Sequence, residues 1–147
     1  MIKDKKKLAG VLIALNLAFI WGNSLMNGTD SGNMSGGIMA WLNSFLGLGP
    51  AGMELLHHLI RKAAHFTEFA CLGALIGWYR CLDTRKHEIA MPVLLGMAAG
   101  LVDETIQLFT PDRGPSLTDV WIDTSGALTG IMLLILGHHL IKRKINH

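Results

Sequence analysis

The charged residues of this chain are bunched together, and this distribution limits what the chain can fold into. Half of the 147 residues are hydrophobic and only 16% are charged, so long stretches carry almost no charge. A soluble domain needs polar residues along every helix, because one face of each helix meets water. An apolar stretch of about 20 residues instead matches the hydrocarbon core of a bilayer. We therefore predict an integral membrane protein of the all-α class.

Four apolar stretches are long enough, or nearly so, to cross a bilayer. They cover approximately residues 8–26, 63–82, 89–109 and 120–141. The first follows a cluster of lysines, as a signal peptide does, but Trp21 stands where a cleavage site would need small residues. We interpret it as an uncleaved first span. The sequence thus predicts a single domain over residues 1–147, folded as a transmembrane four-helix bundle.

The segment between the first two spans has a different character. Residues 27–37 are rich in Gly, Ser and Asn, which predicts a loop. Apolar residues from Ile38 to Phe45 then recur at the spacing of one helical face, and a second apolar stripe begins near Met53. Neither stripe is long enough to span a membrane. We predict two short interfacial helices on the extracellular side.

Each of the last three spans contains a Gly-x-x-x-Gly pair. The pairs are Gly73 with Gly77, Gly96 with Gly100, and Gly126 with Gly130. Small residues one turn apart let helix backbones approach closely in lipid. Because the pairs recur in consecutive spans, we expect them to pack helices of one chain together rather than to form a dimer.

The basic residues predict the orientation of the chain. With four spans, both termini and the loop between the second and third spans lie on one side. That side holds ten of the 13 Lys and Arg residues, namely Lys3, Lys5, Lys6, Lys7, Arg80, Arg85, Lys86, Lys142, Arg143 and Lys144. Cytoplasmic loops carry the excess of basic residues, so both termini are predicted to be cytoplasmic.

Polar side chains recur at i, i+4, i+7 near the outer ends of the last three spans, which stacks them on one helical face. The sets are Arg61, His65 and Glu68; Gly100, Glu104 and Gln107, with Asp103 beside them; and Asp119, Asp123 and Gly126. Arg113 and Ser116 stand in the loop before the last span. At about 1.5 Å per residue, one acid in each set lies roughly 6–9 Å below the outer surface. We expect these acids to converge.

Two interpretations of this polar cluster remain open. A charge at the centre of a spanning helix costs about 3 kcal/mol, so the groups could simply hold the helices together through hydrogen bonds. The second is an outward-facing pocket whose basic rim of Arg61, Lys62 and Arg113 binds a phosphate or carboxylate.

Catalysis is a variant of the pocket interpretation. Glu68, Glu104 or Asp123 could act as general acid or base with His65, or acids and His65 could ligate a divalent metal. No sequence motif for a metal, a nucleophile or a phosphate-binding loop is present. We therefore assign no metal and no cofactor.

Two blocks of the sequence resemble the VanZ-like family of membrane proteins. They are RKAAHFTEFACLGALIGW, from Arg61 to Trp78, and GLVDETIQLFTPDRGPSLTDVWIDTSGALTG, from Gly100 to Gly130. They contain the ordered patterns R-K-x-x-H-F-x-E, D-E-x-x-Q and R-x-x-S-x-x-D. Phe69 stands where the family has Tyr, and Asp112 where Gly is common, but no charged motif residue is lost.

The resemblance implies a four-helix bacterial membrane protein, related to a founding member associated with low-level teicoplanin resistance. It also implies a set of binding-site residues: Arg61, Lys62, His65, Glu68, Asp103, Glu104, Gln107, Arg113, Ser116, Asp119 and Asp123. It does not imply a chemical activity.

These observations together predict a multi-pass protein of the bacterial plasma membrane that binds an anionic amphiphile. The expected partners are membrane lipids, and a lipid-linked wall precursor or a glycopeptide, with no nucleic acid. The alternative is a membrane enzyme that modifies a lipid or wall-precursor headgroup by acid–base chemistry. The oligomeric state does not follow from the sequence.

Overall fold

The computed structural model describes residues 2–26, 28–84, 88–111 and 113–145, and within these residues the secondary structure is helical throughout, with no strand. The helices are α1 (Ile2–Leu25), α2 (Gly28–Leu46), α3 (Pro50–Thr84), α4 (Ala90–Gln107) and α5 (Leu117–Ile145). This confirms the all-α class. Arg85 and Lys86, which support the predicted orientation, and the motif position Asp112 lie outside the described residues.

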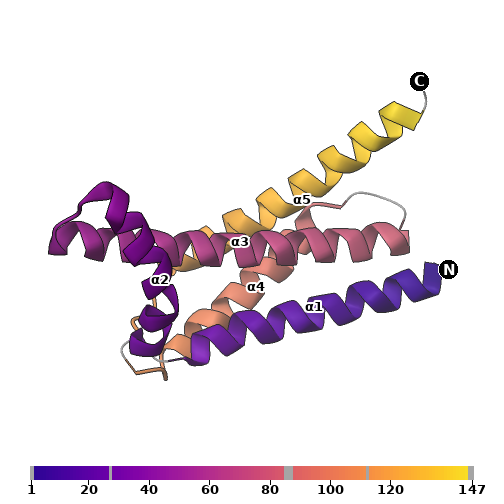
Figure 1. Ribbon diagram of the computed structural model, residues 1–147. Coiled ribbons are helices and arrows are strands. Elements are labelled where there is room, and N and C mark those ends of the chain that lie inside the picture. The colour runs from indigo at the N-terminus through magenta and orange to yellow at the C-terminus, as the bar shows by residue number, and fades with distance from the viewer. Residues whose placement is uncertain (1, 27, 85–87, 112, 146–147) are drawn as a thin grey trace.

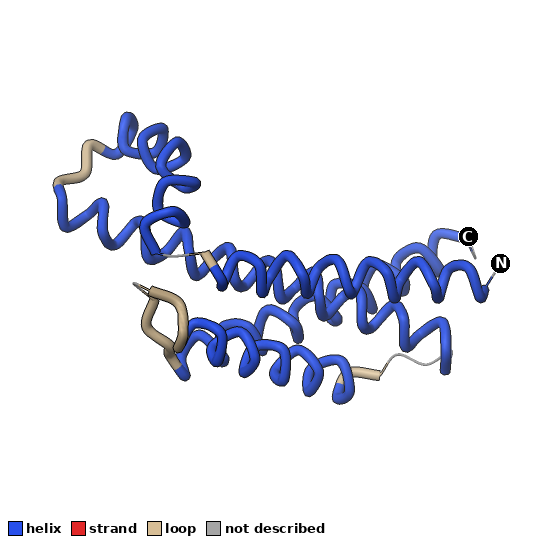
Figure 2. Tube along the Cα trace, turned by 90° about the horizontal axis from the view of Figure 1, so that it is seen from below, coloured by secondary structure: helices blue, strands red, loops and turns tan. Residues whose placement is uncertain are grey.

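The helices α1, α3, α4 and α5 form a bundle, and α2 lies across one end of it (Figure 1). The most extensive contact joins α3 to α5, while α1 packs on α3 and α4. The chain enters and leaves the bundle at the end opposite α2, so both termini lie at the same end in Figure 1 and Figure 2. Each predicted span overlaps one of these four helices.

The prediction of two separate short helices is wrong for the second of them. Its residues form the first turns of α3, which runs without a break from Pro50 to Thr84. The reason is that no Gly or Pro interrupts the chain between Gly52 and Gly73, so the helical hydrogen bonds continue into the predicted span. At about 1.5 Å per residue, the 35 residues of α3 extend for about 52 Å.

The prediction of a loop over residues 27–37 is also wrong where the structure describes it, because α2 already begins at Gly28. Weak local propensity is overridden when a helix packs on a neighbour, as α2 does on α3. The helix ends at Gly47, whose φ of +59° is the left-handed conformation that favours glycine after a helix. Pro50 then starts α3, a position where its missing N–H costs nothing.

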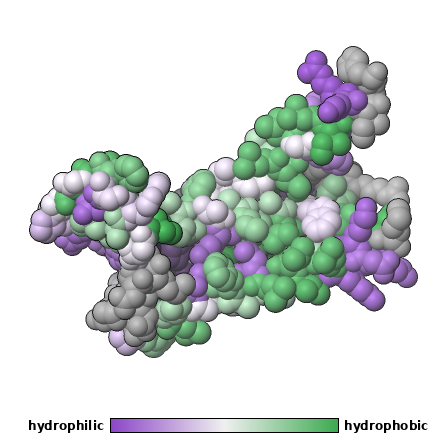
Figure 3. Space-filling view, in the orientation of Figure 1, coloured by the Kyte–Doolittle hydropathy of each residue, from purple (hydrophilic) through white to green (hydrophobic). Residues whose placement is uncertain are grey.

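The bundle has an apolar exterior, and its interior combines an apolar core with buried polar side chains. Asp103, Gln107 and Asp123 are 0% exposed, whereas Leu15 and Leu133 are each 61% exposed. Figure 3 shows hydrophobic surface along the flank of the bundle, with hydrophilic side chains gathered at the end that holds the termini and near α2. A soluble protein rarely buries acids while exposing many large apolar side chains, so lipid is the natural surrounding.

Two helices, α1 over Ile2–Leu25 and α5 over Leu117–Lys144, are long and apolar enough to cross a membrane by length and composition. Together with the apolar exterior, they indicate a membrane protein.

Glycines mark the closest helix contacts within this chain. A Cβ atom on Gly73 would strike the backbone of Ala127 in α5, and one on Gly130 would strike the backbone of Ala70 in α3. On α4, a Cβ on Gly96 would lie 2.6 Å from the Ala127 side chain. The glycine pairs therefore pack helices of the same chain together, as predicted, and hold α3, α4 and α5 in register around the polar residues described next.

Candidate functional site

Three side chains from three helices meet in the interior of the bundle. His65 of α3 places its Nδ1 atom 3.8 Å from Oδ2 of Asp103 on α4 and 3.8 Å from Oδ1 of Asp123 on α5. The two carboxylates are 0% exposed, and the imidazole side chain is 12% exposed. Potential metal-ligand atoms of these three residues all lie within 4.8 Å of one another. We call this set the central triad.

Asp103 is the best connected member of the central triad. Its Oδ1 atom accepts a 2.6 Å hydrogen bond from Ser24 at the end of α1, and its Oδ2 atom accepts one of 2.8 Å from Gln107. Gln107 in turn accepts a 2.8 Å hydrogen bond from Nη2 of Arg61. A chain of hydrogen bonds thus links α1, α4 and α3, which fixes the orientation of the Asp103 carboxylate.

Asp123 is the opposite case, because neither of its oxygens has a hydrogen-bond partner among the described residues, and His65 Nδ1 has none either. Buried polar atoms are nearly always paired. The approach of α4 to this carboxylate depends on Gly100, where a Cβ atom would lie 3.1 Å from Asp123 Oδ2. A fully buried acid has therefore been left with unsatisfied oxygens beside a histidine and a second acid.

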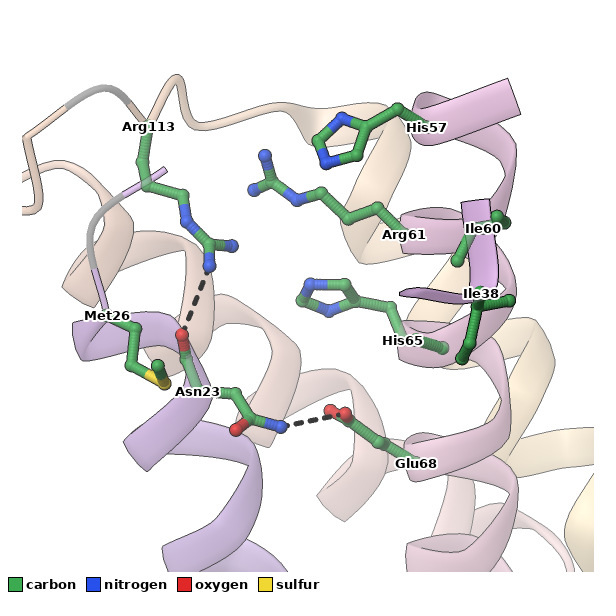
Figure 4. A pocket seen from close by; sticks show the side chains of 10 residues that line it. Asn23, Met26, Ile38, His57, Ile60, Arg61, His65, Glu68 and Arg113 are labelled. Atoms are coloured by element: carbon green, nitrogen blue, oxygen red, sulfur yellow. Dashed lines mark hydrogen bonds between the residues drawn. The ribbon is translucent and has the colours of Figure 1, made fainter. Parts of the chain in front are cut away.

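A cavity of about 250 Å³ opens on one side of α3, between α3 and the end of α1. Figure 4 shows His57, Arg61, His65 and Glu68 along α3, facing Asn23 and Arg113 across the space. Glu68 accepts a 3.0 Å hydrogen bond from Asn23 Nδ2, and Arg113 Nη2 donates one of 3.2 Å to the Asn23 carbonyl oxygen. We call this space the arginine cavity.

Arg113 is held partly inside the protein. Its Nε atom is buried and has no hydrogen-bond partner within the described part of the chain. Burial lowers the pKa of the Arg113 guanidinium from its ordinary value, and the positive charge of Arg61 lowers it further. Arginine nevertheless stays charged at physiological pH, so two cations face the arginine cavity.

A second cavity of about 360 Å³ lies on the other side of Arg61 and His65, which line both spaces. At its rim Lys62 Nζ lies 3.0 Å from Asp119 Oδ1 in an ion pair whose lysine side chain is 42% exposed. Ser116 also lines this cavity, and the backbone N–H of Ser116 donates a 2.6 Å hydrogen bond to Glu104 Oε2. This contact ties the loop before α5 to α4.

The expected convergence of acids is found, although with a different membership. Sequence spacing placed Glu68, Glu104 and Asp123 at one centre, but Glu68 turns toward α1 and Glu104 toward Ser116. Asp103 takes the central position instead. The spacing of Arg61, His65 and Glu68 did place these three side chains along one cavity.

Three contributors were missed: Asn23, Ser24 and His57. Asn23 and Ser24 are a polar pair at the C-terminal end of the first apolar stretch, and His57 stands four residues before Arg61 on the same face. Both features are visible in the sequence and could have indicated that these residues belong to the site.

The apolar exterior and the buried network of ionisable side chains place this protein in the class of small helical membrane proteins that bury polar residues between their helices. A family model described as VanZ/LLP1 matches residues 9–138, which is most of the chain. The chain belongs to the VanZ/LLP1 family. No curated protein and no solved structure gives a significant match.

Proposed function

We propose that this protein is a multi-pass protein of the bacterial plasma membrane that binds an anionic headgroup of an amphiphile in the arginine cavity. The observation that carries the proposal is that Arg61 and Arg113 face the same cavity from different elements. Each uses one Nη atom in a hydrogen bond to the described residues, which leaves other guanidinium donors for a ligand. Guanidinium pairs suit the bidentate recognition of phosphate or carboxylate.

The walls of the arginine cavity favour an amphiphile over a small free anion. Met26, Ile38 and Ile60 line it together with the charged groups, and Ala64 adds further apolar surface. A lipid phosphate, a lipid-linked wall precursor or a teicoplanin-type lipoglycopeptide combines a charged group with an apolar chain. Membership of the VanZ/LLP1 family agrees with a link to glycopeptide resistance.

The distribution of charge supports a cavity that faces outward. Basic residues of α1 and α5 lie at the end of the bundle that holds both termini, where the positive-inside rule expects the cytoplasm. With α1, α3, α4 and α5 as the four spans, the arginine cavity lies toward the opposite end, near α2. The helix α3 is longer than the hydrocarbon core of about 30 Å, so its first turns and α2 would project beyond the core on the extracellular side.

The proposal predicts that an anionic amphiphile raises the thermal-unfolding midpoint of the full chain, because a ligand that binds only the folded state stabilises it. The protein would be held in nanodiscs of zwitterionic lipid and titrated with phosphatidylglycerol, a polyprenyl diphosphate, teicoplanin or inorganic phosphate. Arg61→Ala and Arg113→Ala should each weaken binding about tenfold or more, since a hydrogen bond to a charged group is worth about 1.5–3 kcal/mol.

Arg143→Ala is the matched control, because it removes an exposed arginine from the last turn of α5, far from the cavity. It should leave the stabilisation unchanged. Stabilisation by inorganic phosphate alone would argue against an amphiphile. No stabilisation by any of the four compounds, or equal stabilisation of all variants, would contradict the proposal.

One observation favours the alternative function, a membrane enzyme acting on the headgroup. Glu104 and Asp123 carry buried carboxylate oxygens without a partner among the described residues, and Asp123 lies 3.8 Å from His65, which lines both cavities. Such groups suit proton transfer. If the protein is an enzyme, expression of the gene should change the abundance of a lipid headgroup, and the Glu104→Gln variant should not produce this change. An unchanged lipid profile on expression would argue against catalysis.

A further inference from the structure

We infer that the central triad of His65, Asp103 and Asp123 binds one divalent metal ion. The sequence contains no metal-binding motif, so the assignment rests on the way three helices bring distant residues together. It does not depend on the ligand proposed for the arginine cavity.

The geometry of the central triad suits chelation with a small adjustment. Around an octahedral ion whose ligands lie at about 2.1 Å, two ligand atoms are about 3.0 Å apart when adjacent and about 4.2 Å apart when opposite. His65 Nδ1 lies 3.8 Å from a carboxylate oxygen of each aspartate, and the ligand atoms of the triad all fall within 4.8 Å. Movements of less than about 1 Å therefore bring the three side chains onto one ion.

The unpartnered atoms point to a ligand. Asp123 is 0% exposed, both of its oxygens lack a hydrogen-bond partner among the described residues, and Oδ1 faces the equally unpartnered Nδ1 of His65. A proton shared between these atoms would need a separation of about 2.7–3.2 Å, shorter than the 3.8 Å found. A cation coordinated between them satisfies the imidazole nitrogen and the carboxylates together, and it offsets the charge of two buried acids.

The surroundings of the triad provide the supporting contacts that metal ligands need. Asp103 is oriented by Ser24 and Gln107, and Gln107 is held by Arg61. Hydrogen bonds of this kind fix carboxylate ligands in place. His65 lines both cavities, which provide a route for an ion and its water ligands. One nitrogen and two carboxylates favour Mn²⁺ or Zn²⁺ over Ca²⁺, which prefers oxygen ligands alone.

The test uses the purified full chain in nanodiscs of zwitterionic lipid, stripped with EDTA and then supplied with MnCl₂ or ZnCl₂. After desalting, elemental analysis should find about one equivalent of metal per chain, and the thermal-unfolding midpoint should rise above that of the EDTA-treated protein. Asp123→Asn and His65→Gln should each lower metal affinity at least tenfold. Glu88→Gln, which neutralises a carboxylate paired with Arg80 just before the start of α4, should retain the metal.

The outcomes are distinct from those of the lipid experiment, because no anionic amphiphile is present. If Asp123→Asn does not fold, His65→Gln decides the question, with each variant compared with its own metal-free state. Failure of the wild type to retain either ion overturns the inference. Equal retention by wild type and both variants also overturns it, because the ion would then lie at other sites such as the exposed histidines. Loss of lipid binding with metal binding retained would contradict the proposed function and support the metal site.

Discussion

Replacing Gln107 with leucine is expected to destabilise the bundle by about 2–4 kcal/mol. Gln107 is 0% exposed and joins two charged partners, donating to Asp103 and accepting from Arg61. Leucine has a similar size, so the packing is preserved while these two hydrogen bonds, and the longer one of 3.4 Å that Gln107 donates to Ser24, are lost. A hydrogen bond to a charged group is worth about 1.5–3 kcal/mol in soluble proteins, although interhelical bonds in membranes average less.

The measurement is equilibrium unfolding of the EDTA-treated full chain in mixed micelles, so that no metal contributes. Thr105→Val is the control on the same helix, because the exposed Thr105 hydroxyl donates to the Leu101 carbonyl of its own helix, one turn earlier. It should change the free energy of unfolding by less than about 0.5 kcal/mol. Equal effects of the two substitutions would show that the Gln107 network does not hold the helices together.

Replacing Gly130 with leucine should be still more damaging. A single Cβ atom at this position already collides with the Ala70 carbonyl group of α3, so a leucine forces α3 and α5 apart. Overpacking a tight contact costs about 1–3 kcal/mol for a few methylenes, and here the obstacle is backbone that cannot rotate away. We expect a loss of at least about 3 kcal/mol, or no folded protein by size-exclusion chromatography.

Gly137→Leu on the same helix separates packing from helix propensity. Nothing lies within 4 Å of a Cβ atom at Gly137, so this substitution gains helix propensity without a collision. Its stability should equal or slightly exceed that of the wild type. If both leucine variants unfold alike, the close contact between α3 and α5 is not what stabilises the bundle.

Much of the fold was predictable from local features of the sequence. Four apolar stretches correspond to α1, α3, α4 and α5, and the Gly-x-x-x-Gly pairs identify where these helices touch. The errors concern α2 and the first turns of α3, and for α2 helix formation depends on packing against α3 rather than on the composition of the segment. Composition alone describes residues 28–37 as a loop, whereas the absence of Gly and Pro between Gly52 and Gly73 already indicates an unbroken helix through Met53.

The candidate site was predictable as a list of residues but not as a geometry. Asp103 and Glu104 are neighbours in the sequence, and their side chains differ by about 100° around the helix. Spacing alone favoured Glu104 as the central acid, because it shares a stripe with Gly100 and Gln107. The direction that faces the interior is set by how α4 rotates against α5 at Gly96 and Gly100, and this depends on contacts between distant segments.

One stripe of α5 carries the ion pair at Asp119, the buried acid Asp123 and the close contacts at Ala127 and Gly130. Adding or deleting a single residue within this stretch would turn everything beyond it by about 100°. Asp123 and the close contacts at Ala127 and Gly130 could then no longer face the interior of the bundle together. The length of this part of the helix is therefore constrained, and we expect insertions and deletions to be tolerated only in the connecting segments and in the exposed turns after Gly137.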